Sequence, residues 1–125
     1  MAKKKIKTTS AMLADIIVKG IQEKKGKDIH IMNLTGIHNA MFDYFIICHG
    51  TSNTQIDAIA DSVQDEVFKA VGHHVWHKEG FINSEWILLD YVDVIVHIFQ
   101  KEKRDFYKLE ELWADAEVTI IEDLA

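Results

Sequence analysis

The sequence contains no proline and only one cysteine among its 125 residues. A single cysteine excludes an intramolecular disulfide framework and is compatible with a reducing compartment. Without proline-rich, repetitive or low-complexity segments, nothing in the chain marks a linker between domains. These absences and the chain length predict one domain over residues 10–125, preceded by a flexible basic arm over residues 1–9.

Long apolar runs and an excess of positive charge are also missing. The longest apolar runs are far shorter than the roughly 20 residues that cross a membrane, and Asp15 and Lys19 interrupt the position of a signal-peptide core. The formal net charge of −6 argues against a broad electrostatic grip on nucleic acid. We therefore expect a cytoplasmic protein that binds neither membranes nor specific nucleic-acid sequences, and whose acidic surface suits a basic partner protein.

The spacing of apolar residues predicts an α/β fold. Helices are predicted over residues 10–25, with Ser10 as the N-cap, and from Ser52, which forms a capping box with Gln55, to a C-terminal cap at Gly72. A terminal helix is predicted over residues 101–115. Strands are predicted over residues 28–34, 43–50, 74–78, 86–89 and 94–99, with the last two as an antiparallel hairpin. This order indicates a mixed sheet flanked by helices.

Asp90 and Asp93 are the first candidates for chemistry. Metal-dependent nucleotidyl transfer needs two carboxylates on one strand face, which requires a spacing of two, whereas these residues are three apart and so lie across a turn. The Gly50-Thr51-Ser52 turn before a helix could present N–H groups to a phosphate, but it lacks the lysine and glycine pattern of a P-loop. A nucleotidyltransferase-like enzyme using Asp90, Asp93 and the Gly50–Ser52 turn remains the alternative hypothesis.

The histidines give no catalytic or metal site by their spacing. His73 and His77 would lie roughly 13 Å apart along a strand, which is too far for one zinc ion even with Glu79 nearby. His97 shares a strand face with Ile95 and Phe99, where a lone histidine is most often a hydrogen-bonded partner of a neighbouring group. We therefore predict no catalytic residue, no metal and no cofactor.

A binding surface has more support than catalysis. Aromatic and acidic residues alternate in the last third of the chain, as expected of a docking patch for a basic protein. Two of them, Trp86 and Trp113, could equally be core residues between the sheet and the terminal helix. The predicted partner-binding residues are Trp86, Asp90, Tyr91, Asp93, His97, Tyr107 and Trp113.

Three stretches resemble a known family: IICHGTSNTQIDAIADSV, KEGFINSEWILLDYVDVIVHIF and EKRDFYKLEELWADA. Their motifs occur in the same order in the Iojap family, the bacterial ribosomal silencing factors (RsfS): GTS before a helix with IAD, then EG, W-x-x-x-D-x-x-D with V-H, and R-x-x-Y-x-L-E-x-L-W. The matched positions are Gly50, Thr51, Ser52, Ala60, Asp61, Glu79, Gly80, Trp86, Asp90, Asp93, His97, Arg104, Tyr107, Leu109, Glu110, Leu112 and Trp113.

The resemblance implies a regulator with a nucleotidyltransferase-like topology rather than an enzyme. Members of the family bind the large ribosomal subunit through ribosomal protein L-fourteen, block joining of the small subunit and dampen translation when nutrients are short. The resemblance also implies a homodimer off the ribosome. Many relatives have glycine where Val92 stands. Because valine disfavours positive φ, we expect a different type of turn here.

Overall fold

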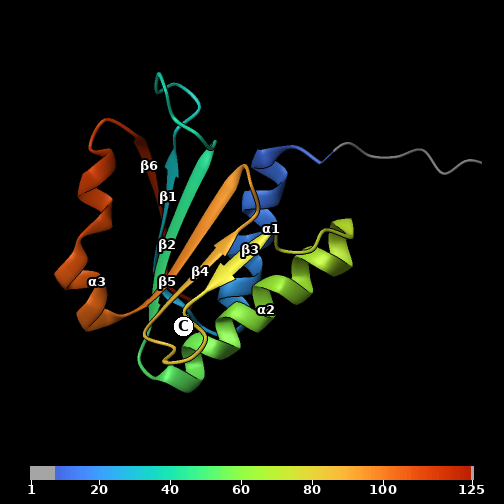
Figure 1. The fold of residues 1–125 in the computed structure, drawn as a ribbon, viewed down its shortest axis with the longest axis vertical. Coiled ribbons are helices and arrows are strands. Elements are labelled where there is room, and N and C mark those ends of the chain that lie inside the picture. Colours follow the sequence, from blue (N-terminus) through green and yellow to red (C-terminus); the bar gives the residue numbers. More distant parts are fainter. Residues whose placement is uncertain (1–7, 125) are drawn as a thin grey trace, which may run out of the picture.

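The computed structural model describes residues 8–124, which form one six-stranded sheet with helices on both faces (Figure 1). The strand order is β3-β4-β5-β2-β1-β6. The elements are α1 (Ser10–Glu23), β1 (Lys27–Asn33), β2 (Tyr44–Gly50), α2 (Asn53–Val71), β3 (His77–Glu79), β4 (Trp86–Asp90), β5 (Val94–Gln100), α3 (Lys101–Tyr107), the 3-10 helix η1 (Leu109–Trp113) and β6 (Glu117–Ile121). The predicted α/β class, a mixed sheet flanked by helices, is confirmed. Most of the predicted basic arm, residues 1–7, lies outside the described residues.

The sheet is mixed because one strand pair is parallel. Strands β2 and β5 run parallel, with Ile47 opposite His97, while the other neighbouring pairs are antiparallel. A parallel pair needs a long crossover, which here contains α2, β3 and β4. The predicted antiparallel β4–β5 hairpin is confirmed, with Trp86 opposite Phe99.

Helices α1 and α2 pack together on one face of the sheet (Figure 1). As predicted, the Ser52 hydroxyl accepts a hydrogen bond from the Gln55 amide at 3.1 Å, and Gly72 ends α2 in the left-handed conformation at φ +71°. The predicted cap of α1 is wrong by one residue. Thr9, not Ser10, accepts the hydrogen bond from the Met12 amide, so Ser10 is the first helical residue.

Alternation along β5 divides the core into two layers. Val94, Val96 and Ile98 belong to the cluster beneath α1 and α2. Ile95 and Phe99 belong to a second cluster on the opposite face, with contributions from β1 and β2. This division follows the predicted strand periodicity. The second face is the one covered by α3 and η1.

The predicted terminal helix is broken where the structure folds back on itself. Helix α3 ends at Tyr107 because Lys108 adopts a left-handed conformation at φ +48°, and η1 follows. This break lets Glu110 return to Arg104, where the guanidinium Nε donates to the carboxylate at 2.6 Å. The left-handed residue Lys108 therefore ends α3, and the Arg104–Glu110 ion pair holds the turn that follows it.

The edges of the sheet also differ from prediction. Strand β6 was not predicted, although its sequence EVTII is rich in β-branched residues; it pairs antiparallel with β1. At the opposite edge, β3 covers only His77–Glu79 rather than residues 74–78. Within residues 8–124 no helix is both long and apolar enough to cross a membrane.

Candidate functional site

A continuous band of aromatic rings crosses the face of the sheet that carries α3. The ring centroids of Tyr107 and Trp86 are 4.9 Å apart, and those of Trp86 and Phe99 are 4.8 Å apart. From β5 the band continues to β2 and then towards η1. We define the aromatic band as Tyr107, Trp86, Phe99, His97, Phe45, Phe42 and Trp113, with further centroid distances of 4.5 Å (His97–Phe45), 6.0 Å (Phe45–Phe42) and 6.1 Å (Phe42–Trp113).

Trp86 is the half-buried residue at which the band meets the first strand of the hairpin. Its indole stacks on Phe99, the residue directly opposite on β5, at an interplanar angle of 26°. The indole Nε1–H donates to Nδ1 of His97 at 2.8 Å. Tyr107 of α3 covers another side of the ring. The indole is therefore held by contacts from both β5 and α3.

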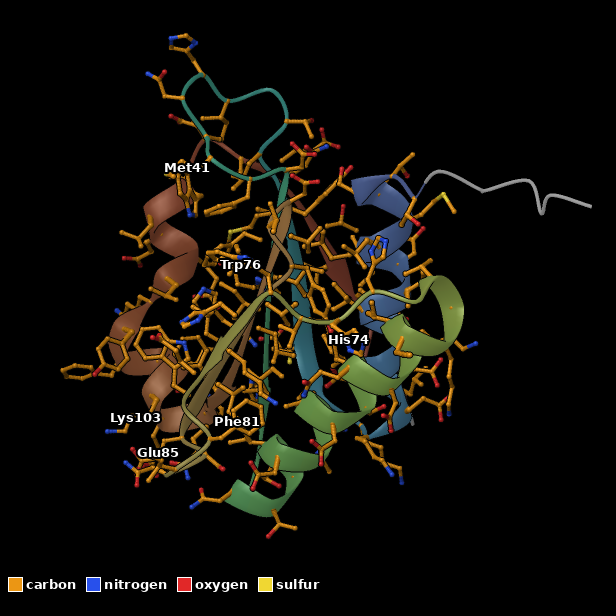
Figure 2. All side chains as sticks on the ribbon, turned by 45° about the vertical axis from the view of Figure 1, so that its right-hand side comes forward. Met41, His74, Trp76, Phe81, Glu85 and Lys103 are labelled. Carbon is orange, nitrogen blue, oxygen red and sulfur yellow. The ribbon has the colours of Figure 1, made fainter. Side chains whose placement is uncertain are left out.

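The loop before Trp86 is tied to both helical layers. The Ser84 hydroxyl, which is buried, donates to the Asp57 carboxylate of α2 at 2.5 Å. On the other side, Lys103 of α3 lies 3.7 Å from the Glu85 carboxylate, and Figure 2 shows the two side chains together. Gly80 passes so close to Trp86 that an added Cβ would lie 1.9 Å from the Trp86 carbonyl oxygen. These contacts fix the backbone from which the indole projects.

Two of the seven predicted partner-binding residues lie in the core and not on the surface. Tyr91 is 7% exposed and packs in the cluster beneath α1 and α2, on the opposite side of the sheet from Trp86. His97 is 5% exposed beneath Trp86. Neither side chain offers a surface to a partner, which corrects the prediction for both. The reason is positional: Tyr91 directly follows β4 on the other face, and His97 lies on central strand β5.

The remaining predicted residues reach solvent to different degrees. Asp93 and Tyr107 are exposed, whereas Asp90, Trp86 and Trp113 are half-buried. The Asp90 carboxylate is occupied within the turn, where it accepts from the Val92 amide at 2.7 Å. Asp90 therefore shapes the hairpin, and Asp93 is the freer of the two acids.

The turn itself contradicts the expectation for Val92. This residue has φ +76°, in the left-handed region that glycine favours. Val92 therefore adopts the positive φ that a valine was expected to avoid. Two hydrogen bonds hold it there: the Asp90 carboxylate accepts from the Val92 amide, and the Tyr91 carbonyl accepts from the Asp93 amide at 3.0 Å. Local hydrogen bonding thus overrides the conformational preference of valine.

The structure separates the two halves of the alternative catalytic hypothesis. Asp90 pairs with Ile95 near the start of β5, whereas Gly50 pairs with Gln100 at its end. At ~3.3 Å per residue, about 17 Å of strand lies between these positions. In addition, the Thr51 amide already donates to the Gln55 side chain at 2.7 Å. The aspartates and the turn before α2 therefore cannot form one nucleotidyl-transfer site.

The histidine-rich segment forms no metal site among residues 8–124, where no group of three histidine, cysteine, aspartate or glutamate side chains is arranged to hold an ion. His77 lies 3.1 Å from the Glu79 carboxylate in an exposed pair. This exposed pair offers only two of the ligands that a structural zinc ion requires.

Comparison with known proteins decides the family. The family model described as "Ribosomal silencing factor during starvation" matches residues 7–125. The chain belongs to the ribosomal silencing factor family. Ribosomal silencing factor RsfS of Bacillus subtilis is 43% identical over 94 residues, which cover 75% of this chain and 78% of the relative. RsfS of Halalkalibacterium halodurans is 36% identical over 110 residues, covering 88% and 92%. The crystal structure of a Chromobacterium violaceum protein has a TM-score of 0.80 at 32% identity, covering 86% of this chain and 88% of that chain.

Membership of the ribosomal silencing factor family confirms the resemblance seen in the motifs, and the structure explains one motif physically. Within R-x-x-Y-x-L-E, Arg104 is buried and joins three elements: it donates to Glu110, to the Asp28 carbonyl at 2.7 Å and to His49 at 2.9 Å. Burial first, and then the Arg104 charge, lower the pKa of His49, so the neutral ring can accept this hydrogen bond. The motif thus anchors α3 and η1 and places Tyr107 over the sheet.

Two exposed apolar residues of the α3 and η1 layer are not in the predicted partner-binding set. Phe106 of α3 is 77% exposed and Leu112 of η1 is 69% exposed. They flank Tyr107 and Trp113 in sequence, so both belong to the layer that carries the rim of the aromatic band. The apolar residues of the motif F-Y-K-L-E-E-L-W were visible in the sequence, but a continuous helix gave no way to tell which of them face outward.

Proposed function

We propose that this protein silences ribosomes by binding the large subunit through ribosomal protein L-fourteen and sterically blocking association with the small subunit. Translation is thereby repressed under nutrient limitation or in stationary phase. Membership of the ribosomal silencing factor family supports the proposal. The exclusion of a single nucleotidyl-transfer site built from Asp90 and the Gly50 turn supports a binding mechanism over that catalytic alternative.

The docking site is proposed at the outer end of the aromatic band, because exposed aromatic side chains lie there. Trp86 and Tyr107 meet there, with Tyr107 46% exposed and Phe106 beside it at 77%. Tryptophan and tyrosine dominate binding energy at protein interfaces because they bury large areas at low conformational cost. The formal net charge of −6 suits a basic ribosomal protein, although the segment of α3 and η1 itself carries exposed charges of both signs, such as Glu102 and Lys108.

The proposed mechanism requires occupancy and no chemical step. A standard interface buries about 800 Å² on each partner. The accessible surface is 7952 Å², so such an interface uses roughly a tenth of it. The rest of the domain remains as an obstacle that an approaching subunit cannot accommodate. Off the ribosome we propose a homodimer, which sedimentation equilibrium tests directly.

The experiment is co-pelleting of purified protein with separated large and small ribosomal subunits. We expect the protein to pellet with large subunits only and to reduce subunit joining measured by light scattering. Trp86→Ala should weaken binding by at least about 30-fold, equivalent to ~2 kcal/mol. The matched control is Trp76→Ala, because Trp76 is 72% exposed just before β3 and outside the aromatic band (Figure 2).

The outcomes separate the components of the proposal. A protein that stays in the supernatant at micromolar concentration contradicts large-subunit binding altogether. If Trp86→Ala and Trp76→Ala bind equally well, the ribosome remains the partner but the docking face is misplaced. Calorimetric titration with nucleotide and magnesium should show no heat of binding, and a clear binding isotherm would reopen the enzymatic alternative.

A further inference from the structure

The hydrogen bond beneath Trp86 joins the exposed end of the aromatic band to the core. Trp86 lies opposite Phe99, and His97 is two residues earlier on β5, so the indole and imidazole are diagonal neighbours on one sheet face. Nε1 of Trp86 and Nδ1 of His97 are 2.8 Å apart. The indole has only this one donor and no acceptor, so the contact selects one orientation of the ring.

His97 is itself rigidly placed. It is 5% exposed, and the rings of Phe45 and Phe99 lie at centroid distances of 4.5 Å and 6.0 Å. Burial lowers the pKa of His97 to about 4, so the ring is neutral at pH 7. A neutral imidazole offers one unprotonated nitrogen, and accepting from Trp86 requires that nitrogen to be Nδ1. The acceptor is therefore fixed in both position and protonation.

We propose that His97 is a positioning residue that presents Trp86 to the partner in a single orientation, an inference that rests on the proposed function. Because His97 already satisfies the indole N–H, the partner has no need to supply a hydrogen-bond acceptor to Trp86. What remains accessible is ring surface beside Tyr107, on a face that carries exposed lysines as well as exposed acidic residues. The recognising group on the partner is thus an aliphatic chain or a cation, such as the stem and head of a lysine or arginine.

The test uses two substitutions at His97 that differ in one property. His97→Asn keeps an acceptor oxygen near the position of Nδ1, whereas His97→Leu removes it and keeps a branched side chain. The resonance of the Trp86 Nε1–H, assigned by its loss in Trp86→Phe, reports the hydrogen bond through its shift and its exchange with water. Large-subunit co-pelleting reports binding.

We expect His97→Leu to shift the Trp86 resonance, speed its exchange and weaken large-subunit binding about tenfold. His97→Asn should remain within about threefold of the unsubstituted protein. Equal binding by the two variants, whether weak or normal, would show that His97 acts only by filling space. If His97→Leu does not fold, a rapidly exchanging Trp86 Nε1–H in the unsubstituted protein is sufficient to overturn the inference.

The results for Trp86→Ala and His97→Leu also distinguish a failure of this inference from a failure of the proposed function. If Trp86→Ala weakens large-subunit binding but His97→Leu does not, the docking face stands and the positioning role is wrong. If Trp86→Ala binds normally, the docking face is wrong and the positioning role falls with it, even where the resonance shows the hydrogen bond intact.

Discussion

The close approach of Gly80 to Trp86 gives the sharpest test of the structure. Gly80 has φ +93°, a backbone conformation that residues with a Cβ rarely adopt. A methyl group added there would lie 1.9 Å from the Trp86 carbonyl oxygen and 2.9 Å from its carbonyl carbon. Both neighbours are backbone atoms and cannot move aside as a flexible side chain would. Gly80→Ala therefore forces the loop away from the start of β4.

The expected cost has two parts. The left-handed conformation costs an alanine ~1–2 kcal/mol, and overpacking in a tight contact costs ~1–3 kcal/mol. Together they reduce the free energy of unfolding by about 3 kcal/mol. For a domain of this size, that loss lowers Tm by roughly 10 °C. Because the displaced backbone carries the indole, large-subunit binding should weaken as well.

Variants of two other glycines distinguish the cost of the left-handed conformation from the cost of the close contact. Gly72 also has positive φ, at +71°, but an added Cβ there meets nothing within 4 Å, so Gly72→Ala should cost only about 1 kcal/mol. Gly36 has open space as well and no unusual φ, so Gly36→Ala should change stability by less than ~0.5 kcal/mol. Urea unfolding of the three variants gives the order directly. If Gly80→Ala is no more destabilised than Gly72→Ala, the close approach to Trp86 is wrong.

Three further predictions concern buried groups. The folded-state pKa of His97 is about 4, below its ordinary value of 6.5. Between pH 6.5 and pH 4 unfolding therefore takes up a proton, and the free energy of unfolding should fall by about 3 kcal/mol across this range. Urea titrations at several pH values should show a smaller fall in His97→Asn. Burial raises the pKa of Cys48 to about 12. The thiol should therefore not react with Ellman's reagent at pH 8 until the protein unfolds. Arg104→Ala leaves Glu110 without its cation and should cost about 3 kcal/mol in urea unfolding, with Arg104→Lys failing to restore it because one ammonium cannot reach three acceptors.

Local interactions explain what could be predicted. Helix α2 was found with both caps because Ser52, Gln55 and Gly72 satisfy helix ends through contacts within a few residues. The β4–β5 hairpin followed from a connection too short for a crossover. The alternation that places Ile95 and Phe99 on one face and Val96 on the other is a property of a single strand.

The elements that the sequence did not predict correctly share a different cause. Strand β6 exists because β1 lies beside it, and those two strands come from opposite ends of the chain. Helix α3 ends at Tyr107, where the chain turns at Lys108 so that Glu110 pairs with Arg104. Both depend on partners distant in space or on a reversal of the chain, which a local pattern does not contain.

The candidate site shows the same division. The sequence by itself determined the family motifs, the position of Asp90 and Asp93 across a turn, and the aromatic and acidic character of the last third of the chain. Only the tertiary structure decided that Tyr91 faces the core beneath the helices and that His97 lies under Trp86 as its hydrogen-bond acceptor. Composition and periodicity follow from covalent order. Burial and pairing depend on which strands become neighbours, and that is settled when the whole sheet forms around one core.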